Sequence, residues 1–150
     1  MKKFTFPFHA ALKYRRHRRD MCRLLLAEVM ADQRKFDEAR LAVLQNQGRQ
    51  ADEMRTIGQA GTFDVDAASA RRFHISRLTM EIAMIDHRRE AVSQQLDLCR
   101  QALRIADQEV KALEKLEERR RTDHNHELER ERALELEDTW MAAHSREFSK

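Results

Sequence analysis

Apolar residues recur at alternating spacings of three and four through the second half of the chain. Eleven of the twelve positions on this spacing are apolar. The twelve positions are Ile75, Leu78, Ile82, Ile85, Arg89, Val92, Leu96, Cys99, Leu103, Ala106, Val110 and Leu113. A heptad stripe sustained over this length is typical of a coiled-coil helix. We therefore predict a long helix over residues 67–142 that buries the stripe against a partner helix.

A weaker stripe on the same spacing occupies the first third of the chain. Seven of its twelve positions are apolar, and the set is Phe8, Leu12, Arg15, Arg19, Cys22, Leu26, Val29, Gln33, Phe36, Arg40, Val43 and Gln47. Five apolar residues beside it are expected to widen it, namely Leu24, Leu25, Met30, Leu41 and Leu44. This pattern predicts a helix over residues 8–57. A short extended lead should precede it, because the residue before Pro7 avoids the helical region.

One bend is expected between the two helices. All three glycines, Gly48, Gly58 and Gly61, fall within fourteen residues of one another. Glycine weakens a helix interior and supplies the positive φ that ends a helix. We place the bend at residues 58–66, with Thr62, Asp64 or Asp66 as the cap of the second helix.

The two stripes together predict an all-α fold, an antiparallel two-helix coiled-coil hairpin forming a single domain over residues 1–150. Paired residue numbers should add to about 118 or about 125, because antiparallel packing alternates its core layers. A bend near residue 60 alone would give a sum of about 121 and place Phe8 opposite Leu113, where the apolar stripe ends, so the register is open by about half a heptad. Residues 114–142 should project beyond the hairpin as a helix about 40 Å long, at 1.5 Å per residue.

Composition supports this architecture and adds a charge pattern. The chain is 37% charged and 6% aromatic, with three Gly and one Pro, so it lacks the turn residues of a strand-rich fold. A basic cluster contains Lys13, Arg15, Arg16, Arg18 and Arg19. Such a cluster fits nucleic acid, anionic lipid or an acidic protein surface, and it is equally typical of a solvated helix face.

The sequence offers no catalytic, cofactor-binding or metal-ligating constellation. Phosphate-loop, zinc-protease and nucleophile-elbow motifs are absent. His124 and His126 are two residues apart, so a helix points them in different directions. Cys22 and Cys99 both occupy stripe positions, where reduced thiols are favoured over a disulfide. We expect a protein without enzymatic activity.

We expect a cytoplasmic protein that does not insert into the membrane. The longest apolar runs fall far short of the roughly 20 residues that span a bilayer, and the N-terminus lacks a secretory signal pattern.

Near the bend the second helix carries more apolar residues than one stripe can bury. Phe73, Leu78, Met80 and Met84 lie close together. They either cover the bend and widen the stripe or form a second docking patch.

Both ends of the chain resemble the flagellar FliJ family. The opening MKKFTFPFHAALKYRRHRR has the basic-aromatic lead and the Leu-x-Tyr/Arg-Arg helix start of that family. The segment ALEKLEERRRTDHNHELERERALELEDTW resembles its C-terminal signature of Leu-Glu-x-Leu, a basic cluster, and spaced Glu and Arg. Two departures affect the details of the C-terminal contact: His124 stands near a position that is commonly aromatic, and Ala133 near one that is usually Gln.

The resemblance implies a soluble accessory component of the flagellar type III export apparatus. Members of the family form a coiled coil similar to the central stalk of rotary ATPases. Their paired termini insert into the hexameric export ATPase and promote its ring assembly. They also contact the cytoplasmic domain of the export-gate membrane protein and escort export chaperones. This implies a peripheral location at the inner face of the cell membrane, with no nucleic-acid partner.

The type and the sequence position of several residues suggest them for the contacts with the ATPase and the export gate. The candidates for the ATPase contact are Arg15, Arg16, Arg18, Arg19, Arg119, Arg120, Arg121 and Glu127. Phe73 and Leu78 are the candidates for the export-gate contact. The alternative is a hairpin that binds nucleic acid or a transcription complex through its basic helix or acidic bend, and a third is a coiled-coil scaffold without a catalytic partner. The oligomeric state, and the choice between a flagellar system and an injectisome, stay open.

Overall fold

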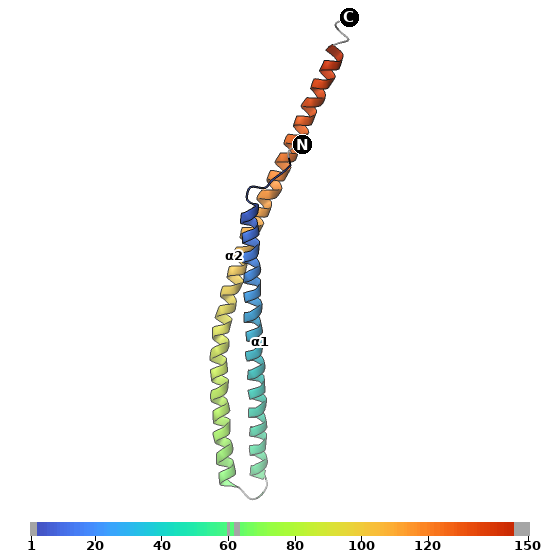
Figure 1. Ribbon diagram of the computed structural model, residues 1–150. Coiled ribbons are helices and arrows are strands. Elements are labelled where there is room, and N and C mark those ends of the chain that lie inside the picture. The colour runs from blue at the N-terminus through green and yellow to red at the C-terminus, as the bar shows by residue number, and fades with distance from the viewer. Residues whose placement is uncertain (1–2, 60, 62–63, 146–150) are drawn as a thin grey trace. The chain divides into compact units, whose positions relative to one another are not determined.

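The protein consists of two long helices in the described part of the chain. The computed structural model describes residues 3–59, 61 and 64–145. Helix α1 runs over His9–Gln59 and helix α2 over Val65–Ser145, against expected ranges of 8–57 and 67–142. The helices pack against each other in antiparallel directions (Figure 1), so the predicted all-α hairpin is confirmed. The chain divides into a turn unit, Met21–Arg104, and a terminal unit, Met1–Asp20 with Ile105–Lys150.

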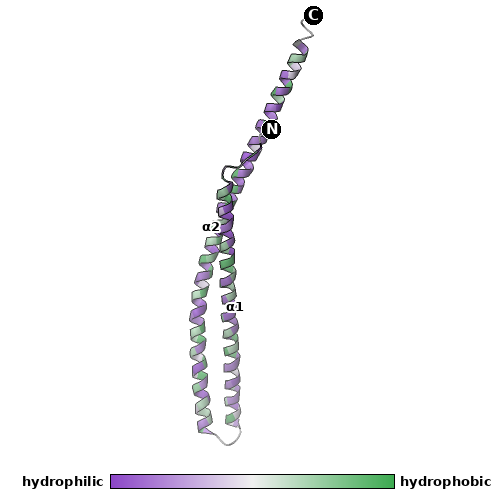
Figure 2. Ribbon diagram, in the orientation of Figure 1, coloured by the Kyte–Doolittle hydropathy of each residue, from purple (hydrophilic) through white to green (hydrophobic). Residues whose placement is uncertain are grey.

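Burial follows the two heptad stripes. Every one of the twelve stripe positions on α2 is buried or half-buried, and so are the eleven on α1, whereas Phe8, just ahead of α1, is exposed. The core of the turn unit contains Val29, Val92, Leu96 and Cys99, with Leu26 and Phe36 packed against it. The alternation of apolar and polar residues along each helix is visible in Figure 2. Sequence periodicity therefore located the buried face of both helices correctly.

Ion pairs in the turn unit fix the register between the two helices. Arg40 pairs with Asp86, and Asp37 pairs with Arg89, so facing residue numbers add to 126. This agrees with the register of about 125 and excludes the one of about 118.

Two polar stripe positions of the turn unit, Arg40 and Arg89, are paired with aspartates on the facing helix. Arg40 Nε donates to Asp86 Oδ1 at 2.7 Å, and Arg89 Nε donates to Asp37 Oδ1 at 2.7 Å. Arg89 also donates to Asp86, at 3.1 Å, which joins the four side chains into one network. Hydrogen bonds from Arg40, and then from Arg89, hold the pKa of Asp86 below its ordinary value. A shift of one heptad would separate all these partners, so the network specifies the register.

The five apolar residues beside the α1 stripe do not widen it. Leu24, Leu25, Met30, Leu41 and Leu44 are all exposed, so the prediction that they contribute to the seam is wrong. A two-helix hairpin buries one narrow stripe on each helix, and residues one or two positions away from that stripe turn toward solvent.

The turn between the helices is shorter than the expected bend over residues 58–66, because α1 ends at Gln59 and α2 begins at Val65. Gly48 and Gly58 lie inside α1, whereas Gly61 follows it with a φ of 78°. Of the three proposed caps, Asp64 serves: its Oδ1 accepts hydrogen bonds from the backbone N–H of Asp66 at 3.0 Å and of Ala67 at 3.2 Å. Asp66 therefore lies in the first turn of α2, and Thr62 is outside the described residues.

The terminal unit has its own small core. Leu12 and Val110 are almost completely buried, and Phe6 joins them from the segment ahead of α1. Phe4, Leu113 and Leu116 pack against this cluster.

None of the helices in the described ranges has a stretch long and apolar enough to cross a membrane.

Candidate protein-interaction site in the terminal unit

The N-terminal lead, residues 3–8, packs against α2 and lines an open hollow in the terminal unit. Phe6 is only 8% exposed and anchors the lead in the core beside Val110. The Phe6 carbonyl accepts from the His9 N–H at 3.2 Å, and the Phe8 carbonyl accepts from the Leu12 N–H at 2.9 Å. These two bonds start α1 immediately after the lead.

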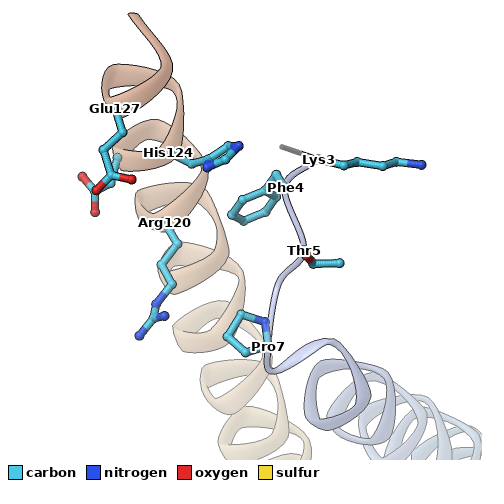
Figure 3. Close-up of a pocket in the computed structure, with 8 residues that line it drawn as sticks. Lys3, Phe4, Thr5, Pro7, Arg120, His124 and Glu127 are labelled. Carbon is cyan, nitrogen blue, oxygen red and sulfur yellow. The ribbon is translucent and has the colours of Figure 1, made fainter. Parts of the chain in front are cut away.

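The lead extends the coverage of α2 beyond the point where α1 begins. The Phe4 ring lies 5.6 Å from the His124 ring between centroids, and in Figure 3 the two side chains point toward each other. Leu113 and Leu116 also pack under the lead. The projection expected from residue 114 therefore begins further along α2, because the lead contacts the helix as far as His124. The alternating Phe4, Phe6 and Phe8 were the available signal, because an extended segment turns alternate side chains to one face.

Two arginines of α2 lie over aromatic rings of the lead. The Arg121 guanidinium carbon is 5.7 Å from the centroid of Phe4, and that of Arg120 is 5.8 Å from the centroid of Phe8. Contacts of this kind stabilise by about 0.5–1 kcal/mol at exposed sites. Arg121 also pairs with Glu117 one turn earlier, at 3.5 Å.

Between the lead and α2 lies an open hollow of about 560 Å³ (Figure 3). Lysine, phenylalanine, threonine and proline side chains line it from the lead, and arginine, aspartate, histidine and glutamate side chains line it from α2: Lys3, Phe4, Thr5, Pro7, Arg120, Asp123, His124 and Glu127. Charges of both signs face one shallow space. This arrangement suits a protein surface with polar side chains better than a small apolar ligand.

The basic cluster of α1 is largely paired with carboxylates of α2. Arg15 pairs with Glu109 at 2.7 Å and Arg16 with Glu114 at 2.8 Å. Arg19 lies 3.9 Å from Asp107 and 3.2 Å from its neighbour Asp20. Arg18 is more exposed and lies 3.6 Å from Glu109. These arginines therefore hold the terminal unit together as well as offering charge to solvent.

The structure brings all eight candidates for the ATPase contact into the terminal unit. Arg15, Arg16, Arg18 and Arg19 lie on α1, and Arg119, Arg120, Arg121 and Glu127 lie on α2. Arg119 is exposed, and Glu127 lines the hollow beside the lead. Arg120 and Arg121 are exposed too but already lie over aromatic rings of the lead, which leaves Arg18, Arg119 and Glu127 as exposed candidates without such a ring contact among the described residues.

The candidates for the export-gate contact differ sharply in exposure. Phe73 is 74% exposed, whereas Leu78 is 3% exposed and packs inside the turn unit. Met80 and Met84 are exposed like Phe73. A partner that docks on the closed hairpin here would meet Phe73, Met80 and Met84 and would not reach Leu78.

The remaining candidate residues are placed as isolated groups. Cys22 is half-buried and Cys99 is buried, both as free thiols. His126 lies 3.6 Å from Glu129 on the same helix. Within residues 3–59, 61 and 64–145, no three His, Cys, Asp or Glu side chains gather closely enough to hold a metal ion.

Comparisons with protein-family models, with curated proteins and with solved structures found no match for this chain. Functional inference therefore rests on the residues and on the geometry above.

Proposed function

We propose that this protein is a stalk-like accessory component of a flagellar type III export apparatus. In this role it binds the hexameric export ATPase through its terminal unit and promotes the assembly and activity of the ring. The proposal joins two observations of different kinds. The two ends of the sequence resemble the FliJ family, and the structure is an antiparallel two-helix coiled coil.

The observation that carries the proposal is the meeting of both resembling segments in one unit. The lead and the first turns of α1 pack against residues 105–124 of α2 through Phe6, Leu12 and Val110. A stalk that enters an ATPase ring with both of its ends needs these ends to form one surface. The polar, open hollow between them suits many weak contacts and offers no enclosed site for catalysis.

Contacts within the terminal unit support a division of roles among the candidate residues. Arg15 and Arg16 make short ion pairs with α2, so their first role is to join the two segments. Arg18, Arg119 and Glu127 are available to a partner, and we assign the direct ATPase contact to them. Further partners, the cytoplasmic domain of the export gate and the export chaperones, belong to the same proposal, with Phe73 as the accessible candidate for the gate.

Nucleic-acid binding draws less support from the arrangement. A phosphate track needs basic side chains that are free to replace counterions. Arg15, Arg16 and Arg19 instead face Glu109, Glu114 and Asp107. Phosphates would have to compete with these carboxylates for the guanidinium groups.

The proposal is tested by direct binding to the purified hexameric export ATPase of the same bacterium. We expect Arg119→Glu to weaken binding by about tenfold, because it removes a cation and introduces a like charge at a contact worth about 1–2 kcal/mol. Arg34→Glu is the matched control, because Arg34 is exposed on α1 in the turn unit and the charge change is identical. Equal weakening by both variants would show a general charge effect, and an absence of any binding by the unaltered chain would refute the proposal.

A further inference from the structure

Within the turn unit, α2 carries a second stripe of uncharged residues on the face that points away from α1. Seven successive positions at alternating spacings of four and three are exposed, and none of them is Asp, Glu, Lys or Arg. Each lies two residues, or about 200° around the helix, beyond a position of the buried stripe. We call these positions the outer stripe, and they are Met80, Met84, His87, Ala91, Gln94, Leu98 and Gln101.

The outer stripe differs from the exposed residues around it. Eight other residues of α2 between Met80 and Gln101 are exposed, and five of these eight are charged. The five are Glu81, Arg88, Glu90, Asp97 and Arg100. Alternating spacings of four and three, kept free of charge, are typical of a coiled-coil seam. The outer stripe therefore suits a further helix as its partner, over about 32 Å at 1.5 Å per residue.

A second copy of the same stripe explains why no charge occurs in it. In a parallel, in-register pair of helices, each seam residue meets the same residue of the other copy. A charged residue would then meet its own charge, whereas a glutamine can meet itself because its amide both donates and accepts hydrogen bonds. Gln94 and Gln101 alternate with Ala91 and Leu98, so this register stacks amide layers between apolar layers. A shift of half a heptad would set each amide against an apolar side chain, which leaves its hydrogen bonds unmade.

The residues along the two edges of the outer stripe fit the same arrangement. Across a parallel seam, a residue on one edge faces a residue of the other edge about five positions further along in the second copy. The facing pairs are Ala83 with Arg88, Glu90 with Gln95, and Asp97 with Ala102. None of these pairs joins like charges. An antiparallel pair would instead set the edge that holds Glu90 and Asp97 against itself, which brings carboxylates together.

We infer that the outer stripe joins two copies of this chain in parallel, with Met84 and Leu98 each beside the same residue of the second copy. The seam covers about three heptads and includes two amide layers, so the dimer is weak and dissociates on dilution. Phe73 lies ahead of the outer stripe and stays accessible in the dimer. The inference rests on the turn unit and is independent of whether the terminal unit binds the export ATPase.

Sedimentation equilibrium of the full chain over a series of concentrations measures this self-association. We expect a monomer–dimer equilibrium for the unaltered chain, and Leu98→Glu should weaken it by at least about tenfold because two carboxylates then meet. Leu24→Glu is the matched control, because Leu24 is 61% exposed on α1 and Leu98 is 64% exposed on α2. A chain that stays monomeric at every concentration, or equal weakening by the two variants, would overturn the inference.

Mixing experiments test whether the two copies meet in parallel register. The Leu98→Glu and Leu98→Lys chains should each be monomeric alone and should form a dimer when mixed, because opposite charges then meet. Met84→Glu mixed with Met84→Lys should behave in the same way, and Met84→Glu mixed with Leu98→Lys should not associate. Two positions fourteen residues apart can each meet themselves only in a parallel pair. Failure of either matched mixture to form a dimer, or a dimer in the unmatched mixture alone, would overturn the inference.

Discussion

Two leucines in the turn unit test the assignment of its buried stripe. Leu96 is 2% exposed and packs in the core with Val29, whereas Leu98 lies two residues further along α2 and is 64% exposed. Burying a leucine side chain stabilises by about 1.5–3 kcal/mol, and truncation of a buried leucine to alanine typically costs about 2–5 kcal/mol once the cavity is included. Because a two-helix core is thin and relaxes readily, we expect Leu96→Ala to cost about 3 kcal/mol.

Leu98→Ala is the matched control for that substitution. About a third of the Leu98 side chain is covered, and alanine is the better helix former. We expect a cost below about 1 kcal/mol. Urea unfolding followed by far-UV circular dichroism measures both free energies of unfolding. Similar costs for the two variants, or a larger cost for Leu98→Ala, would refute the assignment of the stripe.

Three further predictions concern the lead, the register network and the turn. Phe6→Ala should free the lead, which amide hydrogen exchange would detect as faster exchange at the Leu12 N–H while the turn unit stays protected; unchanged exchange would contradict the role of Phe6 as anchor. The pKa of Asp86 is lower in the folded state than in the unfolded chain, so its contribution to stability is present above an ordinary aspartate pKa of about 3.9 and is lost as the pH falls through the folded value. Asp86→Asn should flatten this acid limb of a stability–pH profile, and an unaltered limb would count against the network. At the turn, Gly61→Ala should destabilise by about 1 kcal/mol because φ is positive, and Gly58→Ala inside α1 should stabilise by up to about 1 kcal/mol, so thermal unfolding should shift in opposite directions.

The heptad pattern predicted most of the architecture, namely the two helices and the face that each of them buries. The stripe from Ile75 to Leu113 identified the buried face of α2, because a coiled coil repeats one contact every 3.5 residues and leaves a periodic trace. The same logic identified α1 in spite of its polar stripe positions. Arg40 and Gln47 interrupt the apolar stripe because they meet polar partners, Asp86 and Thr79. Periodicity alone left the register open by about half a heptad, and only the pairing of specific charges settles it.

The terminal unit was harder to predict from the sequence. The lead has no helical period, and its packing depends on Phe6 reaching Val110, about a hundred residues away along the chain. A periodic pattern depends on the spacing of residues that are close in the sequence, so it does not reveal a contact between residues so far apart. The exposure of Leu24 and Leu41 was also not predicted, because both look like core residues by type, yet in the described part of the chain no third helix covers them.

The terminal unit is proposed to activate a hexameric export ATPase. The most direct measurement is the rate of ATP hydrolysis by that ATPase with the full chain and with a chain truncated after Leu113. The truncation removes Arg119, Arg120, Arg121 and Glu127 and leaves residues 21–104 intact, which far-UV circular dichroism would verify. We expect the full chain to raise the rate and the truncated chain to have no effect, and equal stimulation by the two chains would contradict the account.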